Sequence, residues 1–267
     1  MKHSLIYVGV FLLYQTLIAA LVTVVMKFIF PEVTADMAVT KLVVISGISS
    51  LATLATFYFA KWCPMSCDYI KTKPYKTLFW TIILSIALIL PAVWVQELLP
   101  EDYTQDVLAD VMEKLLTRPD GYLLVGIFAP AVEEVVFRGA ILRKLLEWMK
   151  DNFGELTLAN RWIAIVISSV FFATVHFNPA QIPHAFLVGL LLGWMYCRTG
   201  SIIPGLIYHF INNTAAFLLV WIFPNVSTNA KLIEYFDGDK SAMLMAVVIS
   251  VMIAIPCLWQ LNRLMKR

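Results

Sequence analysis

Charged residues are scarce in this sequence, since Asp, Glu, Lys and Arg make up only 14% of its 267 residues. A soluble domain usually carries about 25% charged residues, because its surface must be hydrated. Hydrophobic residues make up 60% of the chain and fall in long blocks, which suit a bilayer better than a soluble core. The net charge of +2 gives no indication of nucleic-acid binding. The composition therefore predicts an integral membrane protein.

The sequence also has few cysteines and few familiar catalytic motifs. The four cysteines, Cys63, Cys67, Cys197 and Cys257, are too few and too scattered for a metal or redox site, so we expect reduced structural thiols. The chain has no H-E-x-x-H motif, and no serine or cysteine stands out as a nucleophile. Strand-like alternation and internal repeats are absent as well, which favours an all-α fold.

Long apolar runs follow one another along the chain, and backbone groups in lipid must hydrogen-bond internally, so we expect these runs to be helices. The first run exceeds the roughly 7–15 apolar residues of a signal peptide, and it is interpreted as a membrane span. The sequence predicts a single membrane domain over residues 1–267 with eight transmembrane helices. These cover approximately residues 5–26, 38–60, 77–96, 121–147, 161–177, 184–198, 202–223 and 242–260.

The distribution of basic residues predicts the orientation of these helices. If the N-terminus is cytoplasmic, the inner segments hold 14 of the 20 Lys and Arg residues, whereas outer residues 97–120 carry seven acids. An excess of Lys and Arg marks the cytoplasmic side, so both termini are predicted to lie there, at the plasma membrane if the source is bacterial. All eight tryptophans lie near predicted helix ends, where indole rings reach the headgroup region.

Several ionisable and amide side chains interrupt the apolar helices of the second half. They are Glu133, Glu134, Arg138, His176, His209, Asn212 and Asn213. A charge near the bilayer centre costs about 2.5–3.5 kcal/mol, so two adjacent carboxylates imply a polar intramembrane cavity and a paired partner. Ionisable residues at this depth are functional candidates by default.

Helical spacing arranges these residues into groups. Glu134 and Arg138 are four residues apart and can pair on one helix face. Glu133 lies about 100° round the helix from Glu134, so it is free to meet a different neighbour. His209 and Asn213 are also four residues apart, and they project together from one helix.

Together these groups can hydrolyse an amide bond. Glu133 can act as a general base that takes a proton from water, while His176 holds that water or shares the proton. Phe172 lies four residues before His176, so its ring can shield one side of the imidazole. His209 and Asn213 can donate hydrogen bonds to an oxyanion, and one such donor contributes about 2.7–4 kcal/mol.

A zinc site is the competing interpretation of the same residues. Glu133, His176 and His209 can supply three ligands and leave a fourth position for water. The three come from different predicted helices, and activation of water without a metal is favoured, with zinc as the alternative cofactor.

Three short motifs carry a resemblance to a known family. They are E-E-x-x-x-R from Glu133 to Arg138, F-x-x-x-H from Phe172 to His176, and H-x-x-x-N from His209 to Asn213. In this order, on successive membrane helices, they resemble the CAAX protease and bacteriocin-processing (CPBP) family of intramembrane endopeptidases, which includes the bacterial Abi proteins. The resemblance covers roughly residues 120–220. It implies eight transmembrane helices around a cavity open to water and membrane.

The resemblance also implies a role for each motif residue. Glu133 and His176 would activate water in a glutamate-dependent reaction, and His209 and Asn213 would stabilise the oxyanion. The remaining motif residues would be supporting ones: Glu134, Arg138 and Phe172. The implied partner is a peptide or protein at the membrane, and a prenylated C-terminus, a leader peptide and a membrane-protein segment all stay open, as does the oligomeric state.

Two other functions use the same residues. A non-catalytic peptide-binding or immunity protein would keep the polar cavity without cleaving, and a transporter would use the residues as an ion relay. The lack of repeats disfavours the transporter. We expect Asn212 to have a packing role and His184, which follows Pro183, to begin the sixth helix.

The predicted depth of His176 is a difficulty. It lies about 22 Å along its helix from Arg161, nearer the outer face than Glu133 and His209. Tilted helices, an inward segment 178–183, or a helix that starts below the inner surface would each remove the mismatch.

Overall fold

The computed structural model describes residues 2–29, 35–64, 66–100, 109–223, 226 and 230–265. Their regular structure is helical, with no β-strand in these residues, which confirms the all-α prediction. Two elements, η2 and η3, are π-helical, and η4 is a 3-10 helix. The elements are α1 (Lys2–Ile29), α2 (Ala35–Phe59), α3 (Cys67–Lys71), α4 (Tyr75–Ala87), α5 (Ile89–Glu97), α6 (Ala109–Leu116), α7 (Pro119–Tyr122), η2 (Leu123–Phe128), α8 (Ala129–Glu133), η3 (Glu134–Leu142), α9 (Arg143–Phe153), α10 (Leu158–Thr174), α11 (Ile182–Thr199), α12 (Ile203–Ile222), η4 (Leu232–Phe236) and α13 (Lys240–Leu264).

Large apolar side chains cover much of the outside of the bundle. On α1, for example, Leu17 is 56% exposed and Leu21 is 64% exposed. Helices lie over all eight predicted segments, and within the described residues five helical stretches are long and apolar enough to cross a bilayer. The five are His3–Ile29, Met37–Phe59, Tyr75–Glu97, Ile203–Ile222 and Lys240–Leu264. An apolar surface of this extent suits lipid, so the chain is an integral membrane protein.

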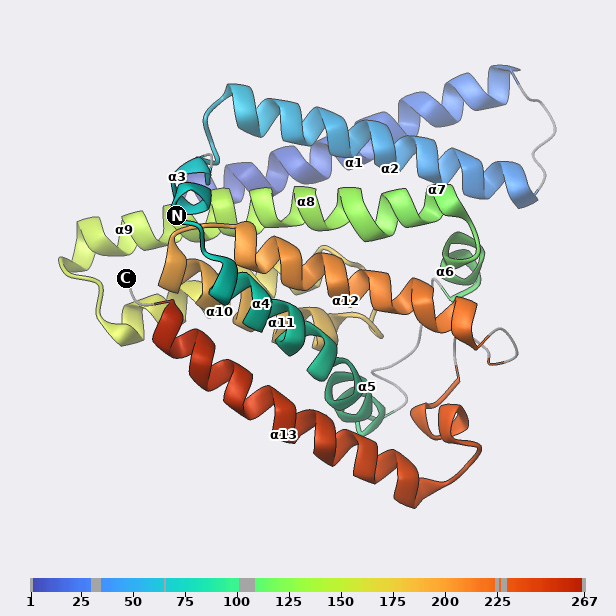
Figure 1. The fold of residues 1–267 in the computed structure, drawn as a ribbon. Coiled ribbons are helices and arrows are strands. Elements are labelled where there is room, and N and C mark those ends of the chain that lie inside the picture. The colour runs from blue at the N-terminus through green and yellow to red at the C-terminus, as the bar shows by residue number, and fades with distance from the viewer. Residues whose placement is uncertain are drawn as a thin grey trace.

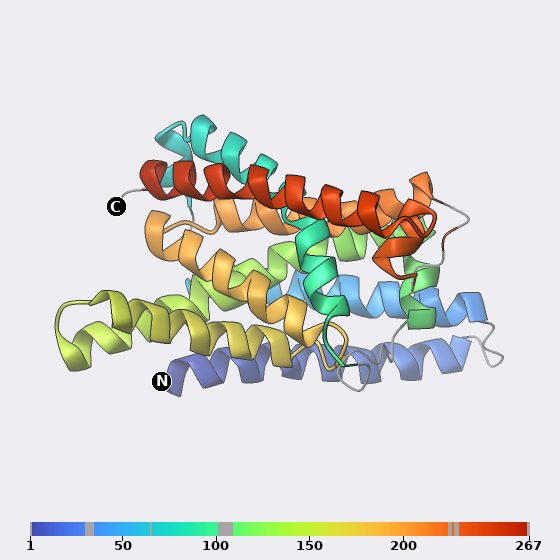
Figure 2. The same cartoon turned by 90° about the horizontal axis from the view of Figure 1, so that it is seen from below.

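The long helices run lengthwise through the bundle. Figure 1 shows α1 and α2 along one edge, the continuous stretch from α7 to α9 beside them, and α13 along the opposite edge. The helices α10 and α11 form an antiparallel hairpin, and α4 packs against both α12 and α13. The N-terminal end of α1 and the C-terminal end of α13 lie at the same end of the bundle in Figures 1 and 2.

The segment predicted as one helix over residues 77–96 is bent. α4 ends at Ala87, and α5 begins two residues later. Pro91 has no N–H to offer the carbonyl of Ala87, and a missing bond of this kind is the usual cause of a sharp bend. Figure 1 shows α5 turning away from the axis of α4.

The turn between α10 and α11 is packed inside the molecule. Asn178 is fully buried and Ala180 is 5% exposed. The bend of α5 brings Gln96 to this turn, where Nε2 donates to the carbonyl oxygen of Ala180 at 2.8 Å. Figure 2 shows the turn ending well short of the far ends of α1 and α2. The turn that contains residues 178–183 therefore lies within the length of the bundle, an arrangement that agrees with the inward segment among the three explanations for the depth of His176.

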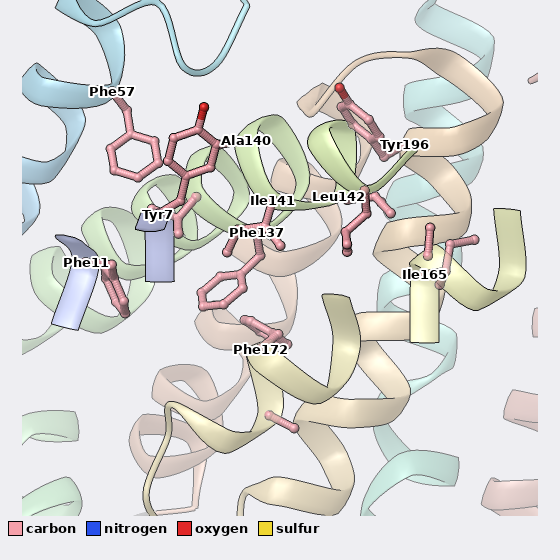
Figure 3. Close-up of a cluster of buried hydrophobic side chains, with 14 of the residues drawn as sticks. Tyr7, Phe11, Phe57, Phe137, Ala140, Ile141, Leu142, Ile165, Phe172 and Tyr196 are labelled. Carbon is pink, nitrogen blue, oxygen red and sulfur yellow. The ribbon is translucent and has the colours of Figure 1, made fainter. Parts of the chain in front are cut away.

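An aromatic cluster joins α1, η3 and α10 (Figure 3). Phe137 is fully buried, and its ring meets Phe11 and Phe172 edge-on, with centroids 5.9 and 5.3 Å apart. Such pairs contribute about 0.5–1.5 kcal/mol beyond the burial itself. The cluster fixes α10 against η3 and so holds His176 at a defined position relative to the carboxylates.

Candidate active site

The two adjacent carboxylates lie on one helical stretch, residues 119–153, whose winding changes along its length. It is π-helical in η2 and η3, and the intervening α8 carries Glu133 at its end. Pro130 has no N–H, so the carbonyl of Val125 lacks the donor that π-winding would bring five residues later. Asn213 on α12 supplies one instead, because its Nδ2 donates to this carbonyl oxygen at 2.9 Å. The bond ties α12 to the helix that carries Glu133.

Glu134 and Arg138 form a buried ion pair, as their spacing predicts. Nη1 of Arg138 donates to Oε1 of Glu134 at 2.6 Å, and each side chain is only 1% exposed. The guanidinium lies over the Phe172 ring, 4.2 Å from its centroid, and Nη2 donates to the carbonyl oxygen of Gly189 at 3.5 Å. Arg138 thus links η3 to α10 and α11. Removal of one member of a buried pair costs about 3–5 kcal/mol, so these helices depend on it.

His209 lies between the two carboxylates. Its Nε2 is 3.5 Å from Oε2 of Glu133, and its Nδ1 is 3.5 Å from Oε1 of Glu134. The side chain of Glu133 is 18% exposed, whereas that of Glu134 is 1% exposed. The carboxylate of Glu134 is therefore held by Arg138, and that of Glu133 keeps room for a ligand.

His176 follows the end of α10, in the inward turn. Its Nδ1 lies 2.8 Å from the carbonyl oxygen of Phe172. A carbonyl oxygen only accepts, so Nδ1 carries the hydrogen in this contact and Nε2 is left with a lone pair. The Phe172 ring meets the imidazoles of His176 and His209 edge-on, with centroids 5.0 and 5.8 Å apart. Phe172 therefore packs against both histidines and shields one side of each.

A pocket of about 380 Å³ collects these groups. All four predicted catalytic residues line it: Glu133, His176, His209 and Asn213. Phe172 lines it as well, whereas the Glu134–Arg138 pair lies outside its lining. The other lining residues come from α5, α6, η2, α8, α11, α12 and the α10–α11 turn: Gln96, Met112, Leu116, Val125, Ala129, Gln181, His184, Ala185, Val188, Asn212 and Ala216. The lining of the pocket is therefore mixed, with both polar and apolar side chains.

Sequence reasoning missed four polar residues of this pocket: Gln96, Gln181, His184 and Asn212. Asn212 is predicted to have a packing role and His184 to begin a helix, yet both line the pocket, and Nδ2 of Asn212 lies 3.4 Å from Nε2 of His184. The position of Asn212 in the pocket could have been predicted from its spacing. It lies three residues after His209, and residues three apart share a helix face. His184 gave no such signal, because its place depends on the inward α10–α11 turn.

The metal alternative requires Glu133, His176 and His209 to converge on one ion. Among the described residues, no three His, Cys, Asp or Glu side chains are grouped closely enough to hold a metal. The donor set as placed does not fit a three-ligand zinc site.

The cysteines are free thiols. Burial raises the pKa of the Cys63 thiol to about 11, although nearby Arg143 opposes the rise. This thiol therefore stays protonated at neutral pH, which suits a structural role.

Gly205 on α12 is required by the buried pair. A Cβ at this position would lie 2.6 Å from Oε2 of Glu134, an oxygen that is buried without a hydrogen-bond partner. We expect Gly205→Ala to lower the free energy of unfolding by about 1–3 kcal/mol, because the site is overpacked. Thermal unfolding of the purified protein in detergent would measure the effect.

Gly47→Ala is the matched control, because a Cβ at Gly47 has no heavy atom within 4 Å. Both glycines lie inside helices, so both substitutions gain about 0.5–1 kcal/mol of helix propensity. Equal melting temperatures for the two variants would show that the contact with Glu134 does not constrain α12.

Comparison with known proteins finds relatives of the motif-bearing region. Residues 120–215, which contain Glu133, His176, His209 and Asn213, match the family model described as type II CAAX prenyl endopeptidase Rce1-like. The UPF0177 protein YxdF of Lactococcus lactis is 32% identical over 104 residues, which are 38% of this chain and 50% of that protein. The match thus spans half the length of that curated relative, and no solved structure matches the chain. Over this region the chain is therefore similar to the type II CAAX prenyl endopeptidases, in agreement with the resemblance that its three motifs carry.

Proposed function

We propose that the protein is an intramembrane endopeptidase that hydrolyses a peptide bond with water activated by Glu133 and His176. The observation that carries the proposal is the convergence of Glu133, His176, His209 and Asn213 on one pocket. The match of residues 120–215 to the type II CAAX prenyl endopeptidase family supports the reaction class.

The first step is attack by water on the peptide carbonyl. The water oxygen forms a bond to the carbonyl carbon while the Glu133 carboxylate takes a proton from the water. Nε2 of His176 accepts a hydrogen bond from the same water and orients it, since Nδ1 is engaged by Phe172. The carbonyl oxygen becomes an oxyanion in the tetrahedral intermediate.

Stabilisation of this oxyanion falls to α12. His209 offers an N–H from Nε2, and Asn213 offers the second hydrogen of Nδ2, because the first is used on Val125. In the second step the C–N bond breaks, and the protonated Glu133 gives its proton to the leaving amine. The carboxylate is then restored, and no group is oxidised or reduced.

The proposed substrate is a membrane-associated peptide, either prenylated or leader-type. A peptide bond reaches the pocket only if an extended segment enters between the helices. The apolar side chains of Met112 and Leu116 on α6 line the same pocket as the polar groups, so they suit a substrate with an apolar portion. A CAAX-type substrate has this character, because its prenyl chain is apolar.

Replacement of Glu133 by Gln tests catalysis directly. We expect Glu133→Gln to reduce cleavage by about 10²-fold or more, because the amide cannot take the proton, while folding and protein level stay unchanged. Proteomics of protein termini, which compares cells with the wild-type and variant proteins, would measure the cleavage.

The control is Glu155→Gln, which makes the same change at an exposed position outside the pocket. A Glu133→Gln protein that leaves all termini and the cellular function unchanged would contradict the proposal, and it would favour a non-catalytic peptide-binding protein.

The proposed reaction uses no metal. We expect cleavage to persist after prolonged dialysis against a strong chelator, since Glu133 and His176 activate the water themselves. Cleavage of an identified substrate and the zinc content of the same sample would be measured together. A loss of activity that added zinc restores would establish the zinc alternative.

The proposed topology has eight membrane crossings with both termini cytoplasmic, in the plasma membrane if the source is bacterial. Its support is the Lys and Arg bias together with the position of both termini at one end of the bundle. We expect a fluorescent protein fused at the C-terminus to fluoresce, and alkaline phosphatase fused after Gly238 to be active. The reverse pattern would overturn the orientation.

A further inference from the structure

A second and larger cavity lies away from the candidate active site. Its volume is about 790 Å³, and its lining comes mainly from α9, α10 and the C-terminal end of α11. Asn262, near the end of α13, also lines it, so the cavity lies at the end of the bundle where both termini lie. The proposed peptidase reaction uses none of its residues.

Positive charge dominates this cavity. Four cationic side chains line it: Arg143, Lys150, Arg161 and Arg198. Glu147 is the one carboxylate among the described residues of the lining, and it is already paired with Arg143 and Lys144. Lys150, Arg161 and Arg198 have no carboxylate at ion-pair distance within the described part of the chain. The cavity therefore carries positive charge that the described protein groups do not balance.

Two further features point to an anion. Arg198 donates from Nη2 to the carbonyl oxygen of Asn262, but its Nε is buried without a hydrogen-bond partner. The first turns of α10 also line the cavity, through Leu158, Arg161 and Trp162. The N-terminus of a helix favours anions, and this one has no acidic residue in its first turn. The cavity thus combines a helix N-terminus with three unbalanced cations, one of which, Arg198, has a buried donor without a partner.

The wall beside these cations is apolar and outward-facing. Leu158 is 72% exposed and Trp162 is 41% exposed, and Ile165 and Trp194 continue the apolar lining. Exposed indole and leucine side chains next to basic groups are typical of the level where lipid headgroups meet acyl chains. A free phosphate would use only the cations, whereas a phospholipid would use both parts of the surface.

We propose that this cavity binds the phosphate of an anionic phospholipid headgroup. The phosphate lies among Lys150, Arg161 and Arg198 at the N-terminal end of α10, and an acyl chain lies along Leu158 and Trp162. Basic pockets between membrane helices on the cytoplasmic side favour such headgroups. The ligand would hold α9, α10 and α11 together at this end of the bundle.

Lipid binding to the purified full-length chain in a neutral detergent tests the proposal. Native mass spectrometry would compare phosphatidylglycerol with phosphatidylcholine of the same chain length. We expect the wild type to prefer phosphatidylglycerol, and Lys150→Gln combined with Arg161→Gln to reduce that preference about tenfold or more, at about 1 kcal/mol for each cation. Each single substitution should give a smaller loss.

Arg263→Gln is the matched control. Arg263 stacks on Trp259 at the same end of the bundle, and it is outside the lining of the cavity. This variant should keep the full preference, although it also loses one positive charge. Equal binding of the two lipids by the wild type, or an unchanged preference in the double variant, would overturn the proposal. Competition by inorganic phosphate as strong as that by phosphatidylglycerol would assign the cavity to a free anion and also overturn it.

Discussion

The positions of the helices around the pocket depend on one buried ion pair, Glu134 with Arg138. Removing two charges from water costs several kcal/mol for each ion, so the stability of the pair depends on the groups packed around it. The face of Phe172 and the carbonyl oxygen of Gly189 contact the guanidinium, and Nδ1 of His209 lies 3.5 Å from Oε1 of Glu134. Because these groups come from α10, α11 and α12, the pair positions three helices against η3. The pocket is the space beside that assembly.

Close approach of the helices follows from the same constraint. A Cβ at Gly189 would lie 2.9 Å from the Cβ of Ser169, and one at Gly205 would lie 2.6 Å from Glu134 Oε2. The two glycines therefore allow the Gly189 carbonyl on α11 and the Gly205 backbone on α12 to approach the Glu134–Arg138 pair closely. The π-helical winding on both sides of α8 also helps to join the helices. It leaves the carbonyl oxygen of Val125 without a backbone donor, and Asn213 on α12 donates to this oxygen instead. Residues outside the three motifs are thus needed to hold the motif residues in their positions.

The sequence predicted those parts of the site that depend on local spacing. The four-residue interval predicted the pairing of Glu134 with Arg138, and the apolar runs predicted helices at all eight segments. The remaining features depend on contacts between distant segments. No local pattern shows that Gln96 binds the backbone of the α10–α11 turn, and this contact accompanies the inward position of His184. The bend before α5 had a local cause in Pro91, but its direction is set by packing.

Charge balance distinguishes the two cavities and indicates what each can bind. In the candidate active site, Glu133 and Glu134 face Arg138 and His209, so charges of both signs lie close together and suit a neutral amide whose charge develops only during reaction. In the second cavity the cations outnumber the one carboxylate, which suits a permanent anion. The 17 residues of α10 connect the two sites, because its first turn lines the basic cavity and its last turn leads to His176. An anion held at the start of this helix would therefore restrain the element that positions the proposed water-binding imidazole.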